Sequence, residues 1–122
     1  MSVSVLVVDD DPAFRGLVGR LLTEWGYQVV GESSTVAEAA TLAGRLQPQI
    51  ALVDIALPDG NGFDLAVRLS AMPTPVRVVL VSADSDPAYA AAAQRAGGRG
   101  FLAKDELTSA SLREMLQGHW GP

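Results

Sequence analysis

The sequence predicts an α/β protein in which a five-stranded parallel sheet is covered on both faces by five helices. Short runs rich in valine, leucine and isoleucine recur five times, and each is followed by apolar residues at helical spacing. Capping and helix-breaking residues separate these units from one another. Strands that alternate with helices pair in parallel, because each helix carries the chain back across the sheet before the next strand begins.

Length and composition indicate one domain over residues 1–122. The chain has 122 residues, of which 48% are hydrophobic, so it can bury a core of its own. It has no cysteine, which excludes disulfides and thiolate metal sites. Its single histidine, His119, excludes a catalytic triad or a metal centre built on several histidines.

The charge balance is acidic, with 14 acidic against 9 basic residues and a net charge of −5. Lysine and arginine are scattered without a basic stripe, so we expect no direct binding to nucleic acid. No apolar run reaches the roughly 20 residues that cross a bilayer. The first residues show no basic segment or cleavage motif of a leader. We therefore expect a cytoplasmic protein that does not bind membranes.

The first unit has clear boundaries. Residues 3–8 form an apolar run typical of a buried strand. Asp11 followed by Pro12 predicts a helix start, and Gly26 predicts its end. The apolar face expected for this helix consists of Phe14, Leu17, Val18, Leu21, Leu22 and Trp25.

The remaining units follow the same logic. Thr35 and Glu38 have the spacing of a capping box, and Pro48 ends the helix that they begin. Asp86-Pro87 predicts another helix that starts with a cap and a proline. The other elements expected are strands over 27–31, 50–53, 76–81 and 100–103, a loop over 57–62, and helices over 63–70, to 96, and 108–117. Periodicity leaves the strand order open, and the flavodoxin-like order 2-1-3-4-5 is one of two common solutions.

Polar residues fall at the ends of the predicted strands. Asp9 and Asp10 follow the first strand, Asp54 the third, Ser82 the fourth and Lys104 the fifth. The carboxyl ends of parallel strands lie along one edge of the sheet, where ligands bind. We therefore expect three carboxylates, a hydroxyl and an amine to meet in one crevice.

This combination favours a particular chemistry. Three neighbouring carboxylates repel one another unless some are protonated or a cation enters, and hard oxygen ligands favour Mg²⁺ or Mn²⁺. Asp54 is then placed to act as a nucleophile toward a phosphoryl group. The metal, the Lys104 amine and the Ser82 hydroxyl would each stabilise one phosphoryl oxygen.

At these positions the sequence resembles the receiver domain of bacterial two-component response regulators. The resemblance extends from Val3 to about Leu116 and implies the flavodoxin-like doubly wound sheet of order 2-1-3-4-5. The motifs that carry it are Val-Val-Asp-Asp at 7–10, Asp54 with Leu-Pro-Asp-Gly at 57–60, Val-Ser-Ala at 81–83 and Gly-Phe-Leu-Ala-Lys at 100–104.

The resemblance implies roles for single residues. Asp54 would be the phosphoacceptor, and its donor would be a sensor histidine kinase or a phosphotransfer protein. Asp10 would bind Mg²⁺ (or Mn²⁺) directly, Asp9 would bind it mainly through water, and Ala56 would contribute its backbone carbonyl. The chain would be a signalling domain and not an enzyme, because its only catalysis would be its own phosphorylation and dephosphorylation.

The resemblance also implies a switch. Ser82 would move toward the phosphoryl group and Phe101 would turn inward. The surface of the fourth helix, fifth strand and fifth helix would then change for a downstream protein partner or a fused output domain, and a homodimer through this surface stays open. Two departures from the family pattern stand out. Asp105 follows Lys104 where the family usually has proline, often after a cis bond, and Phe101 replaces a tyrosine.

Alternative functions stay open at this point. The chain could be a stand-alone switch, or a receiver fragment of a larger helix-turn-helix DNA-binding transcriptional regulator. The glycine-rich region of the fifth strand, followed by Lys-Asp-Glu-Leu at 104–107, resembles receivers attached to such DNA-binding domains. A phosphohydrolase is disfavoured, because such enzymes want a second aspartate where this chain has Ala56. An interaction module that is never phosphorylated is disfavoured by the complete acid set.

Overall fold

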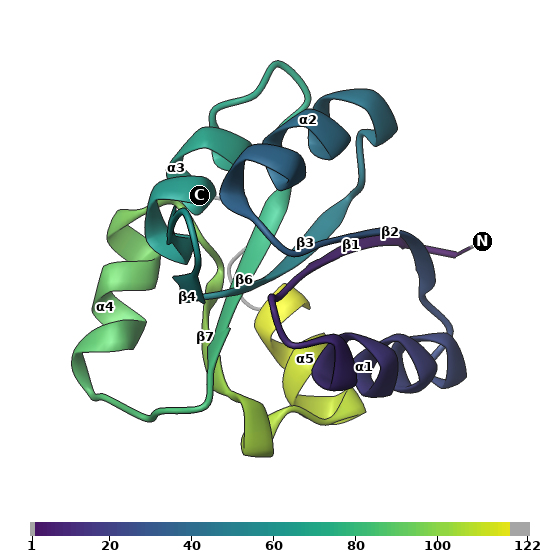
Figure 1. Ribbon diagram of the computed structural model, residues 1–122. Coiled ribbons are helices and arrows are strands. Elements are labelled where there is room, and N and C mark those ends of the chain that lie inside the picture. The colour runs from purple at the N-terminus through teal and green to yellow at the C-terminus, as the bar shows by residue number, and fades with distance from the viewer. Residues whose placement is uncertain (1, 118–122) are drawn as a thin grey trace.

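Five parallel strands form the central sheet of the computed structural model, which describes residues 2–117 (Figure 1). The strands are β1 (Ser4–Val8), β2 (Gln28–Ser33), β3 (Ile50–Asp54), β6 (Arg77–Ser82) and β7 (Gly100–Ala103). Their spatial order is β2-β1-β3-β6-β7. Because β6 and β7 are the fourth and fifth strands of this sheet, the expected order 2-1-3-4-5 is confirmed.

Helices cover both faces of the sheet (Figure 1). They are α1 (Pro12–Glu24), α2 (Val36–Leu46), α3 (Gly62–Ser70), α4 (Ala88–Arg95) and α5 (Ser109–Gln117). Val5 and Val7 of β1 pack in one core cluster with residues of α1 and α5. Leu6 and Val8 point the other way and pack with residues of α2, α3 and α4. Burial on both faces explains why β1, β3 and β6, the inner strands, are largely apolar runs.

Capping residues place several helix ends where the sequence predicts them. The Asp11 carboxylate accepts a hydrogen bond from the Ala13 amide at 2.9 Å, and Gly26 adopts a positive φ of 95° after α1. Thr35 Oγ1 accepts from the Glu38 amide at 3.1 Å. The Glu38 carboxylate, however, accepts from the Ser34 amide at 3.2 Å, so the second half of the expected capping box is displaced by one residue.

The structure corrects three local expectations. Leu17 is 47% exposed, because the buried stripe of α1 centres on Val18 and Leu22 and Leu17 lies about 100° around the helix from Val18. The expected loop at 57–62 contains a small antiparallel pair, β4 (Ala56–Leu57) and β5 (Gly60–Asn61).

The third correction concerns the start of α4. The Asp86 carboxylate bonds to the Ala88 amide at 2.9 Å, and Pro87 occupies the capping position, so the helix begins one residue later than the Asp-Pro pattern suggests. Other element ends differ by one or two residues. The second strand, for example, continues to Ser33 because it pairs with β1 as far as Val8.

Within residues 2–117, none of the helices combines the length and the apolar character needed to cross a membrane. His119 lies outside the described residues.

Candidate phosphoacceptor site

Asp54 ends the central strand β3, and its side chain is only 8% exposed. Its Oδ1 accepts a hydrogen bond from the Ala56 amide at 3.0 Å, and its Oδ2 lies 2.9 Å from Lys104 Nζ. Gly62 at the start of α3 approaches the same backbone. A Cβ on Gly62 would lie 2.4 Å from the Asp54 carbonyl oxygen, so only glycine fits here. The carboxylate is therefore fixed in one orientation at the sheet edge.

Two further acids come from the end of β1. Asp9 is buried, and its Oδ1 accepts a hydrogen bond from the Asp11 amide at 2.9 Å. Asp10 is exposed. Asp9, Asp10 and Asp54 each offer a carboxylate oxygen, and these three oxygens lie within 4.8 Å of one another. The three carboxylates that the sequence places at strand ends do meet in space.

Lys104 joins two of these acids. Its Nζ lies 2.8 Å from Asp9 Oδ2 and 2.9 Å from Asp54 Oδ2, and it also stands 4.2 Å from the centre of the Phe14 ring. Burial lowers the pKa of Lys104, but the hydrogen bonds to Asp9 and Asp54 outweigh it, so the pKa is raised overall. The amine is therefore a fixed positive charge beside Asp54, steadied by a cation–π contact.

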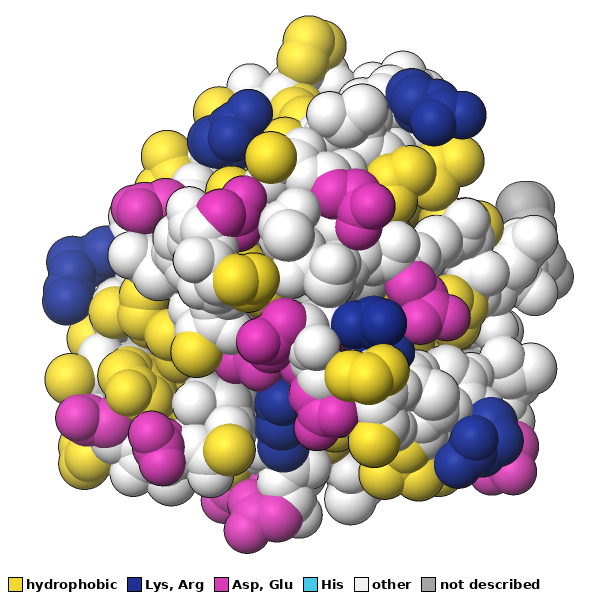
Figure 2. All heavy atoms as spheres, in the orientation of Figure 1, with side chains coloured by type: hydrophobic (Ala, Val, Ile, Leu, Met, Phe, Trp, Pro, Cys, Tyr) yellow, Lys and Arg dark blue, Asp and Glu magenta, His cyan; other side chains and the backbone are white. Residues whose placement is uncertain are grey.

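The donor set fits a hard divalent cation. Asp9 Oδ2 is buried, and within residues 2–117 its one partner is the Lys104 ammonium. Burial raises the pKa of the Asp9 carboxyl, although the hydrogen bond from Lys104 opposes the shift. A carboxylate that is costly to ionise, next to two others, is stabilised by added positive charge. On the face of the molecule drawn in Figure 2, acidic and basic side chains lie side by side near the middle.

Ser82 and Ala56 line the same edge. Ser82 ends β6 and is buried, and its Oγ accepts a hydrogen bond from the Asp84 amide at 3.1 Å. Ala56 is exposed and pairs with Asn61 across the β4–β5 hairpin. Ser82 thus ends the strand that pairs with the strand of Asp54, and Ala56 lies two residues beyond Asp54. Both residues are at the edge of the sheet where the sequence predicts them.

Phe101 lies on β7 and packs partly against the core that contains α2, α3 and α4. Its ring meets Tyr89 of α4 edge-on, with centroids 5.2 Å apart, and Tyr89 is 6.1 Å from the ring of Phe63 in α3. Tyr89 thus links Phe101 to two helices. The sequence carries no signal for this role of Tyr89, because the residue stands alone in an alanine-rich segment.

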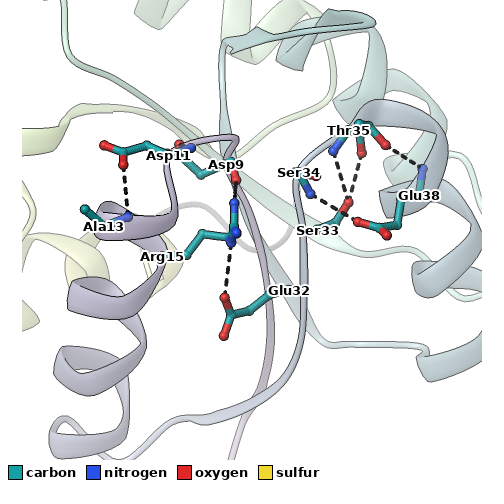
Figure 3. Close-up of polar contacts among 9 residues, drawn as sticks. All are labelled: Asp9, Asp11, Ala13, Arg15, Glu32, Ser33, Ser34, Thr35 and Glu38. Atoms are coloured by element: carbon teal, nitrogen blue, oxygen red, sulfur yellow. Dashed lines mark hydrogen bonds and ion pairs between the residues drawn. The ribbon is translucent and has the colours of Figure 1, made fainter.

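Other contacts that position the site have no recognisable signal in the sequence. The Asp59 carboxylate accepts hydrogen bonds from the Val36 and Ala37 amides at 2.7 and 3.0 Å, which ties the β4–β5 hairpin to the start of α2. These bonds hold the pKa of Asp59 below its usual value. Arg15 reaches the Asp9 carbonyl and the Glu32 carboxylate (Figure 3).

The peptide bond after Lys104 is trans, since no cis bond occurs among the described residues. Asp105 continues into a short 3-10 turn, Lys104–Glu106, in which the Glu106 carboxylate accepts a hydrogen bond from the Ala103 amide at 3.3 Å.

Comparison with known proteins gives consistent relatives. The family model described as response regulator receiver domain matches residues 5–117. The regulatory protein NarL of Mycobacterium tuberculosis is 36% identical over 115 residues, which cover 93% of this chain and 53% of NarL. The chemotaxis protein CheY of Thermotoga maritima is 31% identical over 104 residues, which cover 85% of this chain and 87% of CheY. The chain thus spans about half the length of the first curated relatives.

Solved structures agree with these relatives. The receiver domain of NarL from Mycobacterium tuberculosis superposes with a TM-score of 0.82 at 36% identity, covering 95% of this chain and 98% of that one. A response regulator from Burkholderia pseudomallei, solved with a phosphorylated aspartic acid, a calcium ion and citrate, gives 0.84 at 28% identity, covering 96% of this chain and 68% of that one.

Proposed function

The chain belongs to the response regulator receiver domain family, and on that premise we propose that it is a signalling switch whose phosphoacceptor is Asp54. One observation carries the proposal. The Lys104 ammonium contacts both Asp54 and Asp9, at the point where the Asp10 carboxylate joins them. The phosphorylated aspartic acid in the Burkholderia pseudomallei relative supports the same chemistry.

In the proposed reaction a carboxylate oxygen of Asp54 attacks phosphorus. The new P–O bond forms as the P–N bond of a phosphohistidine on a sensor kinase or phosphotransfer protein breaks, and the leaving imidazole takes up a proton. Lys104 stays charged and stabilises an oxygen of the transferred group. Burial of Asp54 at the end of β3 keeps the nucleophile in a fixed direction.

A divalent cation completes the proposed site. Mg²⁺ (or Mn²⁺) would be held by Asp10, Asp54 and the Ala56 carbonyl, with Asp9 acting mainly through water. When bound, the cation supplies positive charge that offsets the carboxylates and the incoming phosphoryl oxygens.

The proposed output begins at Ser82 and Phe101. The Ser82 hydroxyl accepts a bond from Asp84 and can still donate its own hydrogen, so a move toward a phosphoryl oxygen would draw the β6–α4 loop with it. Phe101 would then follow into the space that opens. Both moves alter the surface of α4, β7 and α5, where a groove of about 540 Å³ is lined by residues such as Leu102 and Met115.

A second role is favoured by the length of the relatives. NarL is named as a regulatory protein of transcription, and this chain matches 53% of it. In this version of the proposal the receiver controls a DNA-binding output domain, and it does not contact nucleic acid itself. A stand-alone role, as the 87% coverage of CheY suggests, would instead require a separate protein partner.

Intact-mass analysis tests the phosphoacceptor. The native protein, incubated with acetyl phosphate and Mg²⁺, should gain one phosphoryl group, and the adduct should disappear when EDTA replaces Mg²⁺. Asp54→Asn should abolish the adduct. Asp64→Asn is the matched control, because Asp64 is an exposed aspartate on α3, and it should be phosphorylated like the native protein.

A native protein that takes up no phosphoryl group from acetyl phosphate or phosphoramidate would refute the proposal. An adduct that survives Asp54→Asn would place the acceptor elsewhere. Repeated hydrolysis of an added phosphomonoester would point to an enzyme in place of a switch.

A further inference from the structure

The backbone of Asp9 is held on both sides. Its amide donates to the Ser33 carbonyl at 2.9 Å, which extends the pairing of β1 with β2 by one residue. Its carbonyl accepts a hydrogen bond from Arg15 Nη1 at 2.5 Å (Figure 3). The Asp9 carbonyl belongs to the same planar peptide unit as the Asp10 amide. The direction of that carbonyl therefore sets the direction in which Asp10 leaves the sheet.

The Arg15 guanidinium binds a second acceptor, the Glu32 carboxylate, at the same time. Its Nε lies 3.2 Å from Glu32 Oε1 on β2, and its backbone amide donates to the Asp11 carbonyl at 3.0 Å. The Arg15 side chain is 21% exposed, whereas that of Glu32 is 49% exposed. One residue of α1 thus connects the loop of acids to the helix behind it and to the edge strand beside it. Arg15 makes its two side-chain contacts from two nitrogens of one rigid planar group, whereas a lysine has a single nitrogen on a flexible stem and would not hold both acceptors in the same directions.

We propose that Arg15 is a positioning residue for the cation site. By holding the Asp9–Asp10 peptide, it orients the Asp10 carboxylate toward Asp54 and so raises the affinity for Mg²⁺. The inference rests on the proposed function and deepens it. It assigns a role to the Arg15 guanidinium, whose contacts described above are with the Asp9 carbonyl and the Glu32 carboxylate and not with the side chains of Asp9, Asp10 or Asp54.

Simple electrostatics predicts the opposite effect. A guanidinium next to a site for a divalent cation repels that cation, so removal of its charge should tighten Mg²⁺ binding. Positioning predicts weaker binding, because a freed peptide would let Asp10 adopt other directions. Residues that orient metal ligands from behind typically contribute 10–100-fold in affinity, and we expect about tenfold here. The sign of the change therefore separates the two explanations.

The experiment measures Mg²⁺ affinity by calorimetry for the native protein, Arg15→Lys and Arg15→Gln. Both variants should bind Mg²⁺ about tenfold more weakly than the native protein. Arg20→Gln is the control, because Arg20 is an exposed cation of the same helix, and it should bind Mg²⁺ as well as the native protein or slightly more tightly. Thermal unfolding in EDTA is measured alongside. Arg15 belongs to neither core cluster, so the variants should unfold within a few degrees of the native protein.

Affinities of both Arg15 variants within twofold of the native value, or tighter binding by Arg15→Gln, would overturn the inference while leaving the proposed function intact. Loss of folding in both variants would also overturn it, because Arg15 would then be a determinant of stability. A native protein that binds no Mg²⁺ and forms no phosphoryl adduct would remove the proposed function together with the inference.

Discussion

The helices α2 and α4 lie on the same face of the sheet but are held very differently. The first turn of α2 is bonded by the Thr35 hydroxyl and by the Asp59 carboxylate, and three of its alanines are buried. For α4, Pro87 stands at the capping position and makes no side-chain cap bond, and the Asp86 carboxylate accepts a hydrogen bond from the Ala88 amide. Of the eight residues of α4, only Ala93 is fully buried.

This difference distinguishes two regions of the molecule. We call the region with α2, the three acids and Lys104 the fixed half, and the region with α4 the loosely held half. Segments with few buried apolar contacts and few fixed hydrogen bonds open at low free energy. The acids and Lys104 belong to the fixed half, where backbone hydrogen bonds and the two ion pairs of Lys104 hold the Asp9 and Asp54 carboxylates. The helix α4 belongs to the other half and is the segment best able to change if Ser82 and Phe101 move as proposed. Four substitutions test this contrast, in order of decreasing effect.

Gly62 packs closely against the backbone of Asp54 in the fixed half. Gly62→Ala would place a Cβ 2.4 Å from the Asp54 carbonyl oxygen, and its nearest neighbours are all backbone atoms of Asp54 and Ile55, so no flexible side chain can give way. We expect the free energy of unfolding to fall by about 2–3 kcal/mol in urea titrations. Gly19→Ala is the control, since its Cβ would meet none of the described atoms within 4 Å. This substitution should raise the free energy of unfolding by up to about 1 kcal/mol. Equal effects at both sites would show that the Asp54 segment can yield.

When no cation is bound, the buried and ionised carboxylate of Asp9 lowers the free energy of unfolding. Its pKa is raised, chiefly by burial, so the stability linked to this group is present at acid pH and is lost as the pH rises through the folded-state pKa. Asp9→Asn should therefore raise the free energy of unfolding at pH 7 in EDTA. The gain should shrink as the pH falls, because native Asp9 is then protonated too.

The same Asp9→Asn substitution should weaken Mg²⁺ binding. Chemical unfolding between pH 4 and pH 8 measures the first effect, and titration with Mg²⁺ measures the second. Asp86→Asn, a change of an exposed aspartate in the β6–α4 loop, should not show the pH-dependent gain. If Asp9→Asn destabilises the protein at every pH, the ion pair with Lys104 outweighs the burial of the carboxylate.

The sequence predicts the sheet and the meeting of the acids because both follow from chain order. A residue at the end of a parallel strand lies at one edge of the sheet whatever its neighbours are. The contacts of Asp59 and Arg15 have no such local signal. Asp59 reaches the amide of Val36, which is 23 residues earlier in the chain, and its turn motif says nothing about that partner. The roles of single residues in phosphorylation stay predictions, since geometry places them together without showing the reaction.

The exposed position of Leu17 has a similar origin. Apolar spacing identifies the helix, but the width of its buried stripe depends on how closely the sheet and α5 approach, which the sequence of α1 does not contain. Tyr89, in the loosely held half, is a second residue whose packing the local sequence does not predict. One aromatic among alanines shows a helix with a weak apolar face, but not that its ring meets Phe101.

Tyr89 carries the main aromatic contact of the loosely held half. Tyr89→Ala removes the edge-on contact with Phe101 and the contact with Phe63. We expect a loss of about 1 kcal/mol in the free energy of unfolding. Ring signals of Phe101 in NMR spectra should show faster exchange between side-chain orientations, while the acid cluster keeps its Mg²⁺ affinity. A large fall in Mg²⁺ affinity would mean that the two halves are not separate.

The smallest expected effect comes from the start of α4, whose first turn contains Ala88, Tyr89 and Ala90 and no acid. The amides at a helix start carry partial positive charge, so Ala90→Glu at an exposed position should stabilise α4 by about 0.5 kcal/mol. Amide hydrogen exchange in 91–95 should slow by roughly twofold, since that free energy corresponds to such a factor. Ala90→Lys has a similar length and the opposite charge, and it should speed the exchange. If both substitutions change exchange in the same direction, then charge at the helix start does not limit the opening of α4, and its weak burial alone accounts for the contrast with α2.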